Sequence, residues 1–296
     1  MDTRVGIVGV GFMGQAYSAN LLKAGFTVQG YDIDPARMDQ LKECGGIPVD
    51  SPAAAARGVR LLVTSLLNNN IVREAALGPN GFAEGVKEGL IIADTSTSLP
   101  EEVQVLGADL AERGIRYLDA SVSGSGAMAM EKDLVLVVGG EKEDFGACGD
   151  LFAAISRAAY LMGPLGSGTR TKLIISIVLY ANRFGLAEGL VLGMKAGMDT
   201  EALLTVLKDS AAYSKQMDQK GEKMIQGDTS PESRLTISLK DSRFILEQGR
   251  SLGVPLFTTS LYSQIAQIGA ETGYADLDPA ALVEVLREMA GLPRRK

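Results

Sequence analysis

The sequence predicts an α/β protein in two parts, a doubly wound parallel sheet and an all-α domain, with a long helix between them. Three observations carry this prediction. Short apolar runs alternate with amphipathic segments up to about residue 160, residues 163–168 interrupt the pattern with glycine and proline, and the apolar residues beyond follow helical spacing. We therefore expect two domains, residues 1–163 and residues 164–296.

The strands of the first domain are expected where apolar and β-branched residues run together. Helical stretches separate the earlier runs, and this rhythm of strand, helix and strand favours parallel pairing. The expected strands are Val5–Val10, Thr27–Tyr31, Leu61–Ser65, Leu90–Asp94, Tyr117–Asp119 and Leu134–Val138.

The second domain is expected to be helical throughout. Its first segment, Thr169–Ala196, covers 28 residues, or about 42 Å of α-helix. The segment is apolar on nearly all sides, so other helices or a second subunit should enclose it. Its apolar run Leu173–Asn182 is half of the roughly 20 residues that span a bilayer, so we expect no membrane partner. The other expected helices are Thr200–Lys208, Leu235–Leu252, Thr258–Thr272 and Pro279–Ala290.

The composition limits the classes of function. A formal net charge of −7 argues against a nucleic-acid partner, because phosphates require a basic surface. The chain has no histidine, which excludes a Ser-His-Asp hydrolase and a histidine-bound zinc centre. Cys44 and Cys148 have neither metal-ligand nor disulfide spacing, so we expect no metal. The first strand is expected directly after Arg4, which leaves no room for a signal peptide and predicts a cytoplasmic protein.

A glycine-rich motif follows the first expected strand. Gly9, Gly11 and Gly14 fit the pattern G-x-G-x-x-G, with Phe12 and Met13 between the last two, and a helix is expected to open there. Gly9 would permit the tight turn, Gly11 the approach of a pyrophosphate, and Gly14 close packing of helix on strand. The motif predicts a Rossmann-type dinucleotide site, and an ordinary glycine-rich turn is the alternative.

An acidic residue ends the second expected strand. Asp32 lies 18 residues beyond Gly14, near the position where an acid bonds the adenosine ribose hydroxyls. The 2′-phosphate of NADP would meet Asp32 and Asp34 before the first cation, Arg37, so we expect NAD as the cofactor. The alternative is that Asp32 is a solvated residue at the end of a strand.

Lys172 is the candidate proton donor. It lies in the expected first turn of the long helix, and an apolar run follows it. Burial and the positive helix end would disfavour its charged form, so that it could exchange a proton near neutral pH. Ser176 and Arg183 share its helical face. Spacing by itself favours a structural or surface role for Lys172.

The chain resembles the β-hydroxyacid dehydrogenase family from residue 4 to about residue 290. The resemblance rests on five ordered blocks of residues. These are Gly9–Gly14 with Asn20–Gly25, Asp94–Thr97, Asp119–Gly124, Gly166-x-Gly168-x-x-x-Lys172, and Lys240-Asp241 with Gly253–Pro255.

The resemblance implies roles for individual residues and an activity. Lys172 matches the family's catalytic lysine, and the activity implied is NAD-dependent interconversion of a small 3-hydroxy acid and its semialdehyde. Dimers or tetramers, joined at the long helix, are also implied. The implied cofactor contacts are Leu66, Leu67, Ser96, Thr97 and Lys240, and the implied substrate contacts are Ser123, Gly124, Ser125 and Ser176.

The chain departs from the family's usual pattern at four positions. In the family, the loop at Ser123 and Gly124 binds the carboxylate of the substrate, and we call it the acid-binding loop. Ser121 replaces a proline and Ser125 the second glycine in this part of the family's pattern. Ile175 and Ser176 stand where asparagines are usual. A hydroxyl gained and an amide lost suggest a changed substrate. An imine reductase-like enzyme and a non-catalytic dinucleotide-binding protein remain alternatives.

Overall fold

The structure, a computed structural model, describes residues 4–84, 86, 89–293 and 295. It divides into two compact units, Met1–Lys172 and Leu173–Lys296. The last strand ends at Gly163 and the long helix begins at Ser167. The expected boundary between residues 163 and 164 therefore falls at the end of that strand, and we keep it as the proposed domain boundary.

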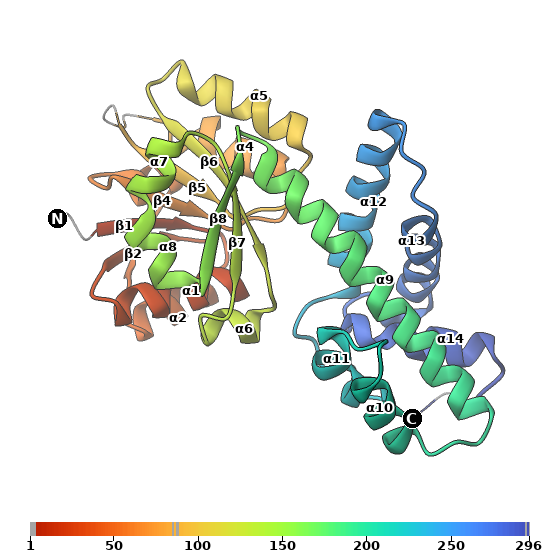
Figure 1. Cartoon of the computed structure of the whole chain (residues 1–296). Coiled ribbons are helices and arrows are strands. Elements are labelled where there is room, and N and C mark those ends of the chain that lie inside the picture. Colours follow the sequence, from red (N-terminus) through yellow and green to blue (C-terminus); the bar gives the residue numbers. More distant parts are fainter. Residues whose placement is uncertain (1–3, 85, 87–88, 294, 296) are drawn as a thin grey trace. The chain divides into compact units, whose positions relative to one another are not determined.

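The first unit is built on a mixed sheet of eight strands in the described part of the chain (Figure 1). The spatial order is β3-β2-β1-β4-β5-β6-β7-β8. The strands are β1 Arg4–Val8, β2 Thr27–Tyr31, β3 Ile47–Pro48, β4 Leu61–Thr64, β5 Ile91–Asp94, β6 Arg116–Ser123, β7 Val135–Gly139 and β8 Ala158–Gly163. The order reverses direction beside β1, as in doubly wound dinucleotide-binding sheets, so the predicted fold class is confirmed.

The sheet differs from the expectation in three places. Strands β6 and β7 pair antiparallel, so the sheet is not wholly parallel. Strand β6 continues to Ser123, although Ser121 and Ser123 interrupt its apolar run, because both residues pair with β7. The sequence analysis missed β3, which has two residues, and β8, a half-exposed strand at the sheet's edge.

Helices cover both faces of this sheet. Alternate strand residues enter different cores: Ile7 packs with α1, α2, α6 and α8, whereas Val8 packs with α3, α4 and α5. This alternation explains why the strands are apolar on both faces. The helices are α1 Phe12–Lys23, α2 Pro35–Glu43, α3 Pro52–Ala56, α4 Asn69–Leu77, α5 Pro100–Ala111, α6 Gly126–Met130, α7 Lys142–Ala147 and α8 Gly149–Ile155.

The second unit is helical in its described residues. Helix α9 supplies side chains to two successive cores: Tyr180 and Phe184 pack with α12 and α13, and Leu186 and Leu190 pack with α10 and α11. The elements are α9 Ser167–Lys195, α10 Thr200–Asp209, α11 Lys215–Gln226, α12 Leu235–Leu252, α13 Phe257–Gly269, η1 Ala270–Tyr274, η2 Pro279–Ala281 and α14 Leu282–Met289. The sequence analysis missed α11, whose buried apolar side chains are the two methionines Met217 and Met224.

Helix α9 is only partly enclosed by this chain. Ile174, Val178 and Leu192 are exposed in the single chain, so on this face the other helices do not supply the cover that was expected from other helices or a second subunit. Among the described residues it is the one helix whose length and mean hydropathy, 1.4 over its most apolar 18 residues, would suit a membrane span. Of that window, 44% is buried inside the protein.

Candidate active site

The glycine-rich loop connects β1 to α1. Gly9 has a φ of 93°, and its N–H donates to the Tyr31 carbonyl at 2.9 Å. A Cβ on Gly14 would lie 2.0 Å from the Gly9 carbonyl oxygen, so helix and loop are in direct contact. A Cβ on Gly11 would meet nothing within 4 Å. The backbone is therefore open at Gly11, where a pyrophosphate would approach the first amides of α1.

Asp32 connects the end of β2 to this loop. Its Oδ2 accepts a hydrogen bond from the Val10 N–H at 2.7 Å, and its Oδ1 accepts one from the Asp34 N–H at 3.0 Å. The nearest cation in sequence, Arg37, lies 5.3 Å from the centre of the Phe12 ring and 3.9 Å from an Asp34 carboxylate oxygen. The carboxylate of Asp32 is thus held beside the dinucleotide loop.

The ends of β4 and β5 form a second hydrogen-bonded corner. The Leu66 N–H donates to Ser96 Oγ at 2.9 Å, which joins two of the predicted cofactor residues. Asp94 organises the corner, because its carboxylate accepts from Thr64 Oγ1 and Tyr117 OH, each at 2.6 Å. Of the other predicted cofactor residues in this corner, Leu67 is exposed and Thr97 is half-buried.

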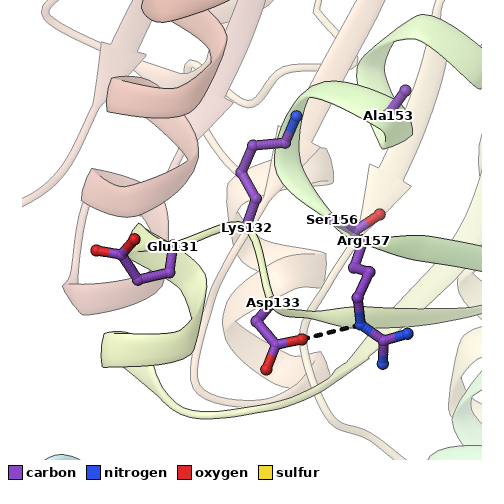
Figure 2. Close-up of a pocket in the computed structure, with 6 residues that line it drawn as sticks. All are labelled: Glu131, Lys132, Asp133, Ala153, Ser156 and Arg157. Atoms are coloured by element: carbon purple, nitrogen blue, oxygen red, sulfur yellow. Dashed lines mark hydrogen bonds and ion pairs between the residues drawn. The ribbon is translucent and has the colours of Figure 1, made fainter.

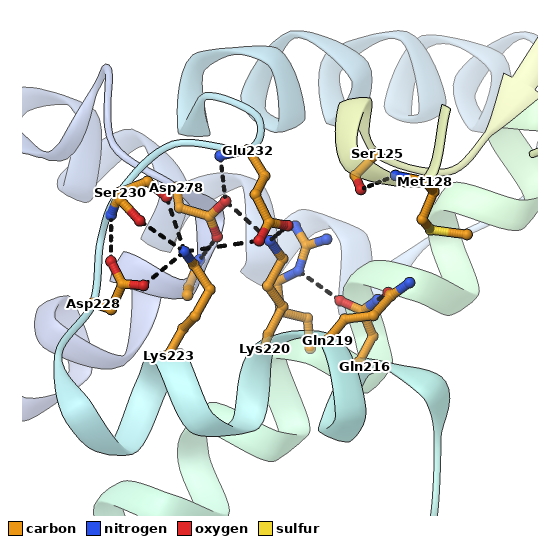
Figure 3. A network of polar contacts seen from close by, with 12 residues as sticks. Ser125, Met128, Gln216, Gln219, Lys220, Lys223, Asp228, Ser230, Glu232 and Asp278 are labelled. Atoms are coloured by element: carbon orange, nitrogen blue, oxygen red, sulfur yellow. Dashed lines mark hydrogen bonds and ion pairs between the residues drawn. The ribbon is translucent and has the colours of Figure 1, made fainter. Parts of the chain in front are cut away.

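The predicted acid-binding loop follows β6. Ser123 ends the strand, and Gly124 has a φ of 147°, a conformation that favours glycine. Ser125 directly precedes α6, and its Oγ accepts a hydrogen bond from the Met128 N–H at 3.4 Å (Figure 3). The hydroxyl gained at position 125 therefore caps a helix. Ser121 lies inside β6 and contacts Thr169, so it does not belong to the loop.

Asp119 joins β6 to the start of α9. Its Oδ1 accepts a hydrogen bond from the Gly166 N–H at 2.9 Å, and its Oδ2 accepts one from the Thr169 N–H at 2.6 Å. The side chain is 1% exposed, and burial raises the pKa of the carboxyl to about 6, although both hydrogen bonds oppose that change. The carboxylate thus serves as the cap of the long helix.

Lys172 lies in the second turn of α9 and is half-buried. The helix starts two residues earlier than expected, so the expected placement in the first turn is wrong. The influence of a helix terminus falls off within one turn. The positive end of α9 therefore no longer supports the expectation that the charged form of Lys172 is disfavoured. The assignment of proton transfer to Lys172 now depends on its position near the capped start of α9.

Ser176, Arg183 and Lys240 belong to the second unit. Ser176 is buried, and Arg183 is buried with its Nε donating to Gln216 Oε1 at 2.9 Å. The Lys240 ammonium lies 3.2 Å from an Asp241 carboxylate oxygen. The hydrogen bond to Gln216 makes Arg183 part of the helical core.

Another lysine of the helical unit is clearly structural. Lys220 is buried, and its ammonium lies 2.9 Å from carboxylate oxygens of both Asp278 and Glu232 (Figure 3). Lys223 pairs with Asp228 at 2.9 Å in the same network. These bonds tie α11 to the segments before α12 and η2, so two carboxylates already use the charge of Lys220.

An open pocket of about 430 Å³ lies elsewhere on the first unit (Figure 2). It contains none of the predicted site residues. Arg157 Nε donates to Asp133 Oδ1 at 2.9 Å across it. The pocket is lined by Glu131, Lys132, Asp133, Ala153, Ser156 and Arg157.

Sequence analysis gave no role to Asp94 or Asp119, although both were quoted in the family blocks. A usable signal was present. Each aspartate ends or interrupts an apolar strand, and a carboxylate in that position must find hydrogen-bond donors. What the pattern could not identify was the donors, which come from Thr64, Tyr117 and the start of α9.

Comparisons with known proteins agree on the family. The NAD binding domain of 6-phosphogluconate dehydrogenase matches residues 4–163, and the NAD-binding domain of NADP-dependent 3-hydroxyisobutyrate dehydrogenase matches residues 166–286. The 2-(hydroxymethyl)glutarate dehydrogenase of Eubacterium barkeri is 31% identical over 98% of this chain and 96% of its own. The L-threonate dehydrogenase of Cupriavidus necator is 29% identical over 96% of each chain. The crystal structure of a 3-hydroxyisobutyrate dehydrogenase from Salmonella typhimurium superposes with a TM-score of 0.88 at 25% identity, over 95% of this chain and 99% of that one.

The sheet order, the glycine-rich loop and these matches define a nicotinamide dinucleotide-dependent oxidoreductase. The chain belongs to the β-hydroxyacid dehydrogenase family, whose members transfer hydride at the CH–OH group of a hydroxy acid. The resemblance carried by the five sequence blocks is confirmed.

The buried Asp119 carboxyl should make folding stability depend on pH. Its pKa rises from 3.8 to about 6 on folding, so its contribution is present below pH 3.8 and is lost as the pH rises through 6. Tyr117, on the same strand, also interacts with it, but burial raises the pKa of that phenol well above 10 and keeps it neutral.

We predict that the unfolding free energy of the protein, relative to that of Asp119→Asn, falls by about 3 kcal/mol between pH 3 and pH 7, at about 1.4 kcal/mol per pKa unit. Urea denaturation of both proteins across this range measures the difference. A difference that does not change with pH would contradict the assignment.

Proposed function

We propose that this enzyme interconverts a small 3-hydroxy acid and its semialdehyde with NAD, and that Lys172 exchanges the proton. The observation that carries the proposal is the double role of β6. Its end leads into the acid-binding loop at Ser123 and Gly124, and Asp119 in the same strand holds the helix that bears Lys172. An acid-binding group and a proton donor are thereby attached to one rigid strand.

The residues present fit a dinucleotide. We assign the pyrophosphate to the loop from Gly9 to Gly14, where Phe12 and Met13 supply the first amides of α1, because the backbone is open at Gly11. The nicotinamide, when bound, supplies or accepts the hydride. Further cofactor contacts are assigned to Asp32, Leu66, Leu67, Ser96, Thr97 and Lys240.

The acid group of the substrate is assigned to the backbone amides at Ser123, Gly124 and Ser125, with Ser176 as a further polar contact. In reduction of the semialdehyde, Lys172 Nζ donates a proton to the carbonyl oxygen as hydride reaches the carbonyl carbon. In oxidation, the hydroxyl proton returns to Lys172. Because the proton and the hydride reach different atoms of one carbonyl, the lysine must be held in place.

Replacement of Lys172 tests the proposed proton transfer. Lys172→Ala should lower kcat by roughly 10² to 10⁴ and leave NADH affinity nearly unchanged, because the glycine-rich loop is intact. Steady-state kinetics on C3 to C5 semialdehydes, with NADH binding followed by fluorescence, measure both quantities. Lys195→Ala, on the same helix but bonded to the Ala290 carbonyl, is the matched control and should retain activity. More than about a tenth of kcat left in Lys172→Ala, with hydride transfer rate-limiting, would remove this lysine from the mechanism.

The position of Asp32 supports NAD as the cofactor. We predict at least a tenfold preference for NAD over NADP in kcat/KM, about 1.4 kcal/mol, because a 2′-phosphate would meet the Asp32 and Asp34 carboxylates. Arg37, the nearest cation in sequence, is within 4 Å of Asp34. Asp32→Ala should reduce the preference. Equal use of the two cofactors by the wild type would show that Asp32 does not contact the ribose.

The altered pocket suggests the class of acid. Ile175 and Ser176 supply no side-chain amide, so a hydroxyl on the substrate chain would lack that hydrogen-bond partner. An unpaired hydroxyl would weaken binding by about 1 to 3 kcal/mol. We propose a substrate other than tartronate semialdehyde, with a less hydroxylated or differently charged chain. In a panel of acids and semialdehydes, a highest kcat/KM on tartronate semialdehyde would contradict this.

The exposed apolar face of α9 supports a homodimer or homotetramer. Ile174, Val178 and Leu192 are exposed on this helix, and a second copy of the chain would cover them. Sedimentation as a 31.2 kDa monomer would contradict the proposal. We also propose a cytoplasmic enzyme of small acids without nucleic-acid or membrane partners; both cysteines are free thiols, which suits a reducing compartment.

A further inference from the structure

The backbone at the start of α9 packs directly against the sheet. A Cβ on Gly168 would lie 2.3 Å from the Asp119 carbonyl oxygen and 2.6 Å from that of Val137, so the helix backbone touches both β6 and β7. A Cβ on Gly139 would lie 2.3 Å from Asp119 Oδ1. Gly139 leaves room for the Asp119 carboxylate, and Gly168 leaves room for the backbones of β6 and β7. The position of the first turn of α9 is therefore set by Asp119 and by the absence of two side chains.

This fit extends to Lys172. The lysine lies three residues beyond Thr169, whose N–H donates to Asp119 at 2.6 Å. Three residues of α-helix are less than one turn and rise about 4.5 Å. A hydrogen-bonded helix moves as a unit over such a distance, so a shift of the backbone at Thr169 would displace Lys172 by a similar amount.

We propose that Asp119 is a positioning residue for proton transfer: it fixes Lys172 relative to the acid-binding loop at the end of the same strand. The inference rests on the proposed role of Lys172. Ser123 lies four residues beyond Asp119 in β6, about 13 Å along the strand. Strand β6 therefore sets the distance between the acid-binding loop and the helix that carries the proton donor.

The chemistry of the contact requires a carboxylate. Two N–H groups point at the side chain, and a carboxylate accepts from both, whereas the amide of asparagine would present its own N–H groups to one of them. The Ser121 hydroxyl also lies near Thr169, but at 3.5 Å from Thr169 Oγ1 it holds the side chain and not the backbone. Burial of the ionised group destabilises the fold near neutral pH, so stability alone does not account for a carboxylate here.

A double-mutant cycle separates positioning from folding. Asp119→Asn should lower kcat by about 10², because a displacement near 1 Å at a reacting group has that effect. NADH affinity should stay within about twofold, and amide hydrogen exchange at Thr169 should become faster. In the Lys172→Ala background, Asp119→Asn should cause no further loss of kcat, because both act through one side chain. Asp119→Ser, whose shorter side chain reaches neither N–H and adds no amide donor facing them, should also lower kcat, and provides a second test if the asparagine variant does not fold.

Asp144→Asn is the matched control. Asp144 is also a buried carboxylate, but it bonds Arg116 at 2.7 Å at the opposite end of β6, so its loss should lower stability and leave kcat unchanged. Unchanged kcat in Asp119→Asn, or losses that multiply in the double variant, would overturn the positioning role while Lys172→Ala remains inactive. An active Lys172→Ala would instead overturn the proposed proton transfer and, with it, this inference.

Discussion

The bond between the Asp119 carboxylate and the first turn of α9 is the contact on which the arrangement of the site depends. It joins a central strand to the helix that continues into the second unit, so the same 29-residue element carries Lys172 near its start and supplies core side chains to the helical unit farther on. The Asp119 side chain is 1% exposed, so its ionisation is opposed by a large loss of hydration free energy. The Gly166 and Thr169 amides offset part of this desolvation, and we propose that the same bonds fix the distance between the acid-binding loop and Lys172.

Two other aspartates act in a similar way at the ends of β2 and β5. Asp32, at the end of β2, accepts the Val10 amide of the glycine-rich loop, and Asp94, at the end of β5, accepts hydroxyls from β4 and β6. Each ties the loop or strand beside it at the carboxyl edge of the sheet, where doubly wound folds bind their ligands. The dinucleotide loop, the corner at the ends of β4 and β5, and the start of α9 are thus held by side chains of one residue type, each bonded to fixed backbone or hydroxyl donors.

Periodicity and glycine spacing were sufficient for the overall fold and for the dinucleotide loop, because strand alternation, helical repeats and tight turns are local properties. Contacts between distant segments were not predictable in this way. The antiparallel pairing of β6 with β7, the edge strand β8 and the polar helix α11 all depend on tertiary neighbours. Lys172 was expected in the first turn of its helix but lies in the second. The reason is that α9 starts where Asp119 caps it, and Asp119 lies 53 residues before Lys172 in the sequence.

We propose direct hydride transfer between NADH and the carbonyl carbon of a semialdehyde acid. The most direct measurement follows deuterium from NADH labelled at C4 of the nicotinamide during reduction of a semialdehyde acid, with mass spectrometry of the hydroxy acid formed. We expect one deuterium on the carbon that bore the carbonyl when NADH is deuterated on one face of C4, and none when it is deuterated on the other face. A hydroxy acid that carries solvent hydrogen at that carbon, or no turnover on any semialdehyde acid, would contradict it.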